Sequence, residues 1–105
     1  MQEPAVFLKS PSAITSCSDV VLYPPGCDKL DYEIELAVVI KEMLKNASPE
    51  EAARAISGYT LMCDYSERAN QLEHGGQWTK GKSYDSFAPM GPTFISADEL
   101  GDGAG

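Results

Sequence analysis

Apolar residues concentrate in two stretches of the chain, and each stretch predicts a strand. In the first, residues 31–40 (DYEIELAVVI), polar and apolar residues alternate at the start and the second half is continuously apolar. This pattern is typical of a strand that enters a core from a polar opening. The second stretch, residues 59–66 (YTLMCDYS), predicts a buried strand. Shorter apolar runs predict strands at residues 5–9, 20–23 and 93–96.

Two helices are expected between and after the two main strands. Residues 48–51 (SPEE) have the features of a helix start: a capping serine, a proline at the first helical position and a glutamate placed to close a capping box. Gly58 is the predicted stop of this helix. Residues 67–73 predict a short polar helix that ends at the glycine pair 75–76. The sequence therefore predicts a β-rich α/β fold.

The length of the chain indicates the number of domains, and its net charge restricts the classes of partner. The 105 residues fit a single domain, and the glycine-rich residues 101–105 are expected to form a disordered end. Eight Lys and Arg against sixteen Asp and Glu give a net charge of -8, which argues against nucleic acid as a partner. The excess suits either a cation site or a solvated surface. No apolar run approaches the roughly 20 residues of a membrane span.

Cysteine spacing indicates the compartment. Cys17, Cys27 and Cys63 are odd in number and lack Cys-x-x-Cys spacing, so the sequence predicts neither a disulfide framework nor a zinc site. A reducing compartment fits best. The N-terminus lacks a basic-then-apolar signal segment, so the cytoplasm is the expected location. A mitochondrial location, reached with a transit peptide that has been removed, fits as well.

Residues 76–83 (GQWTKGKS) match the phosphate-loop pattern G-x-x-x-x-G-K-[ST]. A phosphate loop joins a buried strand to the N-terminus of a helix, where backbone N–H groups converge on the anion. Here a polar segment precedes the motif, and the segment that follows contains two prolines and no helical periodicity. The flanks therefore favour a lysine-bearing surface loop over a nucleotide site.

Acidic residues form a candidate cation site. Glu33 and Glu35 are two apart in a predicted strand, so their side chains share one face, with Cα atoms about 6.5–7 Å apart. A hard divalent cation, Mg²⁺ or Mn²⁺ before Ca²⁺, would relieve their repulsion; the alternative is an edge strand with one solvated face. Asp64, at the end of an apolar run, is either a third ligand or a helix cap. Asp31 is a further acid or a turn residue, and the single histidine, His74, is a weaker candidate.

Three segments together resemble the fumarylacetoacetate hydrolase family, in the same order and at similar spacing. They are residues 30–40 (LDYEIELAVVI), 58–68 (GYTLMCDYSER) and 75–92 (GGQWTKGKSYDSFAPMGP). The family pattern contains a Y/W-E-x-E-L strand, a D-x-S-x-R turn and a long, specific Q-W-x-x-G-K-S/T-x-D-x-F-x-P-x-G-P segment. The resemblance covers nearly the whole chain. It implies a mixed β-sheet roll of the fumarylacetoacetase C-terminal domain type, incomplete in this chain.

The resemblance assigns a metal site and a catalytic lysine. In the family, the two glutamates of E-x-E and the aspartate of D-x-S-x-R bind a divalent cation, which implies Glu33, Glu35 and Asp64 as metal ligands. The lysine of the G-K-S segment lies at the active site, which implies a catalytic role for Lys82. The expected cofactor is Mg²⁺ or Mn²⁺, with Ca²⁺ less favoured.

The resemblance also implies substrate contacts. Gln71 matches a glutamine that contacts substrate in the family, and Ser86 matches a position where some members place a hydroxyl near the metal. Arg68 is expected to hold the turn by pairing with a carboxylate.

The implied function is that of a divalent-metal-dependent hydrolase, lyase or isomerase of 2-oxo or 1,3-dicarbonyl acids. The substrates would be of the acylpyruvate, diketo acid or diketo sugar-acid type, and the cation would polarise a carbonyl and stabilise an enolate. The resemblance looks closest to the diketo sugar-acid branch and implies a homodimer for the full-length form. Members also carry an upstream lid segment with a His and Glu pair and a downstream T-G-T-P segment, and this sequence has neither. The alternative is therefore a non-catalytic chain that keeps only a metal site or an interaction surface.

Overall fold

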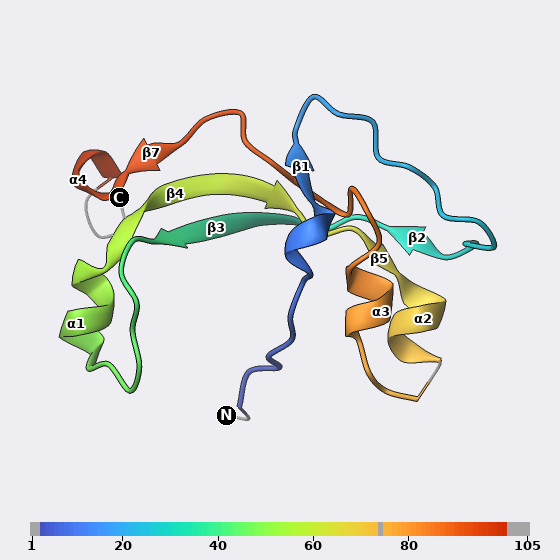
Figure 1. Cartoon of the computed structure of the whole chain (residues 1–105), viewed down its shortest axis with the longest axis horizontal. Helices are drawn as coiled ribbons and strands as arrows, with labels where there is room; N and C mark the ends of the chain where they lie inside the picture. The colour runs from blue at the N-terminus through green and yellow to red at the C-terminus, as the bar shows by residue number, and fades with distance from the viewer. Residues whose placement is uncertain (1–2, 74, 101–105) are drawn as a thin grey trace.

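Two long antiparallel strands form the backbone of the fold. The computed structural model describes residues 3–73 and 75–100. In it, β3 (Ile34–Ile40) pairs antiparallel with β4 (Ile56–Cys63) (Figure 1). On the other side of β4 lies β6 (Ala88–Met90), which pairs in parallel with β1 (Ile14–Ser16), so the order is β1-β6-β4-β3. The sheet is therefore mixed, as expected.

Shorter elements complete the fold. The strand β7 (Ile95–Ser96) pairs with β4 near Gly58. A second sheet of two strands pairs β2 (Leu30–Asp31) with β5 (Ser66–Glu67). The helical segments are η1 (Pro11–Ala13), α1 (Pro49–Arg54), α2 (Arg68–Leu72), α3 (Thr79–Lys82) and α4 (Ala97–Leu100). Both expected helices are present, and the β-rich α/β class is confirmed.

Each of the two main predicted strands is interrupted in the structure. The stretch 31–40 divides between β2 and β3, and the stretch 59–66 divides between β4 and β5. Both interruptions fall at acidic residues, Glu33 and Asp64, and they allow one chain segment to pair in two different sheets. The interruptions therefore lie where the two sheets meet.

Two of the short predicted strands are wrong. Residues 5–9 and 20–23 are irregular in the structure. In the second stretch, the Leu22 N–H donates to the Ser86 hydroxyl rather than to a neighbouring strand. The prediction at 93–96 is confirmed only for its second half, as β7. β1 and β6, of three residues each, are too short to leave a readable pattern.

Helix α1 begins as predicted and ends earlier. Ser48 accepts a hydrogen bond from the Glu51 N–H, and the Glu51 side chain accepts one from the Ser48 N–H, so the capping box is present. The helix ends at Arg54, and Gly58 is not its stop. Gly58 lies inside β4, where an added Cβ would come within 2.3 Å of the Ile95 carbonyl oxygen. This glycine therefore permits the close approach of β7.

Helix α2 depends on a buried glutamate at its N-terminus. Glu67 is the N-cap, and its carboxylate accepts hydrogen bonds from the N–H groups of Ala69 and Asn70 and from the Asn70 side chain. Burial alone would raise the pKa of Glu67, but these hydrogen bonds outweigh it and hold the pKa below its usual range. The capping interaction is therefore strongest when Glu67 is ionised.

Helix α3 contradicts the expected surface loop at residues 76–83. Gly81 and Lys82 are buried in this short helix, which packs against α2. An added Cβ on Gly81 would lie 2.6 Å from both the Gln71 nitrogen and the Glu67 carbonyl oxygen. A helix of four residues is too short for a periodic pattern, so packing rather than local sequence determines it.

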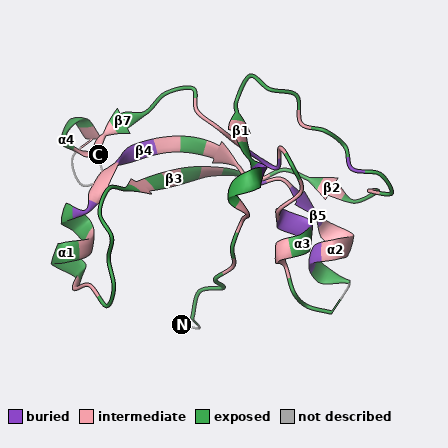
Figure 2. Ribbon diagram, viewed as in Figure 1, coloured by how far each residue is buried: buried purple, intermediate pink, exposed green. Residues whose placement is uncertain are grey.

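The buried core is small and lies beside the junction of the two sheets. Ala13, Phe87 and Ala88 are fully buried, and partly buried side chains, among them Tyr65 and Tyr84, pack around them. In β3, by contrast, successive residues alternate between exposed and half-buried (Figure 2). The exposed apolar residues are Ile34, Leu36, Val38 and Ile40. The prediction of a buried run is therefore wrong for this face, because no element among the described residues covers it.

All three cysteines lie in the described part of the chain, and none forms a disulfide. Among the described helices, none has the length and hydropathy needed to cross a membrane. His74 and the predicted disordered end, residues 101–105, lie outside the described residues.

Replacing Glu67 with Gln is expected to destabilise the fold. The substitution keeps the shape but removes the charge that several N–H groups share, so we expect a loss of about 1.5–3 kcal/mol at neutral pH. Because the folded-state pKa of Glu67 lies below its ordinary value of 4.5, its contribution is present above that pH and disappears as the pH falls through the folded-state pKa. Urea unfolding of wild type and Glu67→Gln between pH 3 and 7 measures this difference.

The exposed Glu73, at the other end of α2, provides the control. Glu73→Gln removes only a surface ion pair with Lys29, so its effect should stay below about 1 kcal/mol. An equal loss in both variants, or a difference that persists unchanged at pH 3, would contradict the capping role.

Replacing Gly81 with Ala should disturb the contact between α2 and α3. The added methyl group meets backbone atoms of Glu67 and Gln71, which cannot move aside as a flexible side chain could. Overpacking of this kind costs about 1–3 kcal/mol, measurable as a lower midpoint of unfolding. Lys80→Ala, at an exposed position of the same helix, should leave the midpoint nearly unchanged. A Gly81→Ala protein as stable as Lys80→Ala would show that the helices are not tightly packed.

Candidate metal centre

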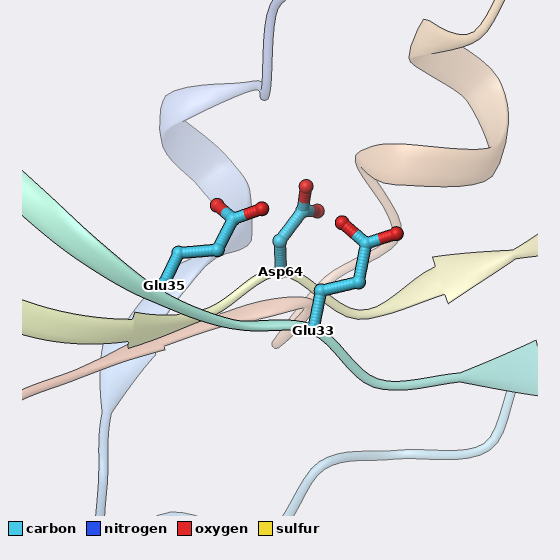
Figure 3. A group of neighbouring side chains, drawn as sticks. All are labelled: Glu33, Glu35 and Asp64. Atoms are coloured by element: carbon cyan, nitrogen blue, oxygen red, sulfur yellow. The ribbon is translucent and has the colours of Figure 1, made fainter.

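Three carboxylates converge where β3 and β4 meet the second sheet. Glu33 and Glu35 flank Ile34 and therefore point to the same side of β3. The antiparallel register places Ile34 opposite Cys63, and the next residue, Asp64, donates its N–H to the Glu33 carbonyl oxygen at 2.7 Å. Figure 3 shows the three side chains on one side of the strands. Each offers an oxygen that lies within 4.8 Å of the others.

Lys82 lies deep within this cluster. Its Nζ donates to Asp64 Oδ2 at 3.0 Å and lies 3.4 Å from Glu33 Oε1. Lys82 and Asp64 are each only 1% exposed. The Phe7 ring covers the ammonium group, with its centroid 4.7 Å from Nζ. The lysine expected on a surface loop is therefore a buried partner of the candidate metal ligands.

Arg68 approaches the cluster from the side of Glu33. Its guanidinium donates to Glu33 Oε2 at 2.5 Å and to Asp31 Oδ2 at 3.2 Å. The expected pairing with a carboxylate is thus observed. Asp31 lies on the outer side of this arginine, with about half of its side chain exposed to solvent, and is not part of the three-carboxylate group.

Lys9 is a third cation at the cluster. Its Nζ donates to Asp64 Oδ1 at 2.5 Å and to the Tyr65 carbonyl oxygen at 3.1 Å. Burial lowers the pKa of this lysine, and the lowering outweighs the opposite effect of Asp64. Lys9 could not be identified from the sequence, because one lysine at the end of a short apolar run matches no spacing rule. Only the fold brings residue 9 to residue 64.

The carboxyl groups of the two glutamates have different electrostatic environments. Burial raises the pKa of Glu35, and the negative charges of Asp64 and Glu33 raise it further. Burial acts in the same direction on Glu33, but the charges of Arg68 and Lys82 outweigh it and lower the pKa of Glu33. Among the described residues, Glu35 forms no ion pair. Glu35 is thus the carboxylate whose charge is least compensated.

The donor set fits a hard divalent cation. Carboxylate oxygens are the ligands that Mg²⁺ and Mn²⁺ prefer, and the three acids supply ligand atoms from one small volume. An ion there would neutralise the repulsion that raises the pKa of Glu35. The site contains no histidine or cysteine ligand, as zinc would favour, among the described residues.

The structure places the two candidate substrate-binding residues differently. Gln71 is buried in α2, and its Oε1 accepts a hydrogen bond from Arg68 at 2.7 Å. Because Arg68 also donates to Glu33, this arginine links Gln71 to the carboxylate cluster. The Ser86 hydroxyl accepts a hydrogen bond from the Leu22 N–H at 3.0 Å. This bond attaches the loop around Leu22 to Ser86. Among the described residues, no hydrogen bond connects Ser86 to the carboxylates.

Phe7, whose ring lies over the Lys82 ammonium group, also lines an open cleft. The cleft has a volume of about 420 Å³ and is lined by Phe7, Trp78, Gln77 and neighbouring residues of the two segments. The rings of Phe7 and Trp78 are 5.3 Å apart. A volume of this size is in the range of small-molecule sites.

Comparisons with known proteins agree with the resemblance. A curated relative, 2,4-didehydro-3-deoxy-L-rhamnonate hydrolase of Sphingomonas sp. (strain SKA58), is 43% identical over 100 residues, which are 95% of this chain and 35% of that protein. The chain thus spans about a third of the length of this relative.

Solved structures show the same fold. A 5-carboxymethyl-2-hydroxymuconate delta-isomerase from Mycobacterium smegmatis matches with a TM-score of 0.85 and 35% identity, covering 91% of this chain and 38% of that one. A 2-hydroxyhepta-2,4-diene-1,7-dioate isomerase from Mycobacterium marinum matches with a TM-score of 0.85 and 36% identity, covering 90% and 37%.

The match to a protein family extends over the whole sequence. Residues 1–105 match the family described as fumarylacetoacetate (FAA) hydrolase C-terminal. Because this match, the fold and the cluster of Glu33, Glu35 and Asp64 agree, the chain belongs to the fumarylacetoacetate hydrolase family, of whose members it represents a part.

Proposed function

We propose that this chain carries the metal centre of a hydrolase, lyase or isomerase that acts on 2-oxo or 1,3-dicarbonyl acids. The observation that carries the proposal is the convergence of three carboxylates with the buried Lys82. Glu33, Glu35 and Asp64 would hold Mg²⁺ or Mn²⁺. A bound divalent cation would act as a Lewis acid toward the oxygens of a keto acid and so favour the enolate form of the substrate.

The balance of charge supports an anionic substrate. Without a metal, the three carboxylates are matched by three cations, Lys9, Arg68 and Lys82. A divalent cation therefore leaves the centre with an excess of positive charge, and the excess persists when the outlying Asp31 is counted. A buried excess of charge is unfavourable unless a counter-charge binds. The carboxylate of a keto acid supplies that counter-charge.

Lys82 is the residue that we propose as catalytic. It contacts two of the ligands, so an oxygen bound next to the cation would lie near its Nζ. A fixed ammonium group in a buried position stabilises negative charge that develops on a substrate oxygen. The Phe7 ring keeps water away from one side of this group.

Gln71 is proposed as a substrate-binding residue. Because its Oε1 accepts from Arg68, its NH₂ group is left to donate to a substrate oxygen. Ser86 stays a prediction as a substrate-binding residue, since its observed partner is the Leu22 backbone.

The names of the relatives indicate the substrates to test first. The curated relative is named as the hydrolase of a didehydro-deoxy sugar acid, and the two solved relatives are named as isomerases of unsaturated acids with two or three carboxylates. All of these compounds carry a carboxylate, as the charge balance requires. We therefore place the diketo sugar acid first, followed by acylpyruvate and oxaloacetate.

We further propose a homodimer for the full-length form and a cytoplasmic or mitochondrial location. The exposed apolar face of β3, on which Leu36 is 58% exposed, supports the first, because such faces are commonly covered by another surface. The odd number and the spacing of Cys17, Cys27 and Cys63, which suit a reducing compartment, support the second. Light scattering and cell fractionation measure these two properties.

Replacing Glu35 with Gln should abolish turnover. The variant keeps the shape of the side chain but loses the charge of a proposed ligand. Loss of a hydrogen-bond partner of a metal ligand costs up to about 100-fold, so loss of a ligand charge should reduce metal-dependent turnover by at least about 100-fold. The measurement is the rate of substrate loss for the three acids with Mg²⁺ or Mn²⁺. Glu42→Gln, at an exposed position just beyond β3, is the matched control.

The same assay separates the proposal from its alternative. Equal rates in wild type and Glu35→Gln would refute the assignment of the metal site. Binding of Mn²⁺ by the wild type without turnover of any of the three acids would overturn the enzymatic proposal and favour a non-catalytic metal-binding chain.

Replacing Lys82 with Met should separate binding from chemistry. The variant retains all three carboxylates, so Mn²⁺ should still bind, while kcat should fall about 100–1000-fold because an oxyanion partner is lost. Calorimetric titration and steady-state kinetics measure the two effects. A Lys82→Met protein with normal kcat would exclude a catalytic role for this lysine.

A further inference from the structure

We propose that Lys9 is a positioning residue of the metal centre: it holds the Asp64 carboxylate in the orientation needed for metal binding. The inference rests on the proposed function, because it concerns the same three ligands. It adds a residue from the N-terminal segment, far from the E-x-E and D-x-S-x-R motifs in sequence.

Asp64 is the ligand whose orientation most needs support. Its side chain is fully buried and lies in the irregular link between β4 and β5. The carboxylate makes two hydrogen bonds among the described residues, one to each oxygen: Lys9 donates to Oδ1 at 2.5 Å and Lys82 to Oδ2 at 3.0 Å. The two lysines thus approach the carboxylate through different oxygens.

The two lysines differ in what else they contact. Lys82 is also close to Glu33 and is the proposed catalytic group, so it must be free to interact with the substrate. Lys9 instead donates its second hydrogen bond to the Tyr65 carbonyl oxygen at 3.1 Å. It therefore connects the carboxylate of Asp64 to the backbone of the next residue. Such a connection fixes the direction of the side chain relative to the strand from which it leaves.

The segment that carries Lys9 is attached to α3 on both sides of the lysine. Before it, Phe7 lies against Trp78 and over the Lys82 ammonium group. After it, the Ser10 N–H donates to the Ser83 hydroxyl at 2.8 Å. Lys9 itself has a side chain only 12% exposed, so it is held in place rather than free in solvent.

The physical effect follows from the behaviour of metal ligands in general. A carboxylate that binds a metal through one oxygen is usually hydrogen-bonded through the other, and loss of such an outer partner reduces metal affinity about 10–100-fold. Lys9 occupies Oδ1 of Asp64. The other oxygen, Oδ2, lies on the side of Glu33, because the Lys82 ammonium group contacts both Oδ2 and the Glu33 carboxylate. Lys9 thus directs one chosen oxygen of Asp64 toward the metal.

The test compares Mn²⁺ binding by variants of the full chain. Lys9→Met removes the hydrogen bonds and the charge, and we expect the Kd for Mn²⁺, measured by calorimetry or by electron paramagnetic resonance of free Mn²⁺, to rise about 10–100-fold. Lys9→Arg keeps a charged donor and should recover most of the affinity. Lys29→Met is the matched control, because the Lys29 side chain is half-exposed and pairs with Glu73 rather than with any of the three carboxylates.

The outcomes separate this inference from the proposed function. Wild-type protein that binds no Mn²⁺ overturns both. Wild-type binding that Lys9→Met leaves unchanged or tightens, while Glu35→Gln abolishes it, overturns the positioning role alone. If Lys9→Met does not fold, as judged by circular dichroism, Lys9→Gln takes its place. This variant has a neutral donor at residue 9, and we expect it to bind Mn²⁺ less tightly than the wild type. An unchanged Mn²⁺ affinity of Lys9→Gln overturns the inference.

Discussion

The buried ion pair between Asp64 and Lys82 is the constraint on which the rest of the site depends. Each group is almost completely removed from water, and a buried charge without a partner is strongly destabilising. The two residues must therefore be brought together whenever the chain folds. Because Asp64 follows β4 and Lys82 ends α3, this requirement fixes the helix against the junction of the two sheets.

This constraint also explains why residues 76–83 match a nucleotide motif without its structure. In a phosphate loop the glycines allow backbone N–H groups to approach an anion. Here Gly81 instead allows α3 to approach α2, since any side chain would strike the backbone of Glu67 and Gln71. The lysine that follows then points to carboxylates of its own chain. The same sequence pattern thus supports a contact between two helices and an ion pair rather than phosphate binding.

The sequence predicts those features that depend on neighbours along the chain. The capping box at Ser48 and Glu51 and the shared face of Glu33 and Glu35 follow from local spacing alone, and both are observed. Lys9 and α3 could not be predicted, because their positions result from contacts with residues ten or more positions away. The buried run expected in β3 failed for a related reason: apolar residues predict a strand, but only the surrounding elements decide which of its faces is covered.

The two faces of β3 differ in the interactions that they make. One face carries Glu33 and Glu35. Glu33 and the neighbouring Asp64 form ion pairs with Lys9, Arg68 and Lys82, so the polar network holds these distant segments together, whereas Glu35 takes part in none of these pairs. A network of this kind is sensitive to the loss of its buried members, because removing either Asp64 or Lys82 leaves the other charge buried without that partner. The other face presents exposed aliphatic side chains and contributes little to the small core around Phe87. Local order around the candidate metal centre therefore depends more on the pairing of charges than on apolar burial.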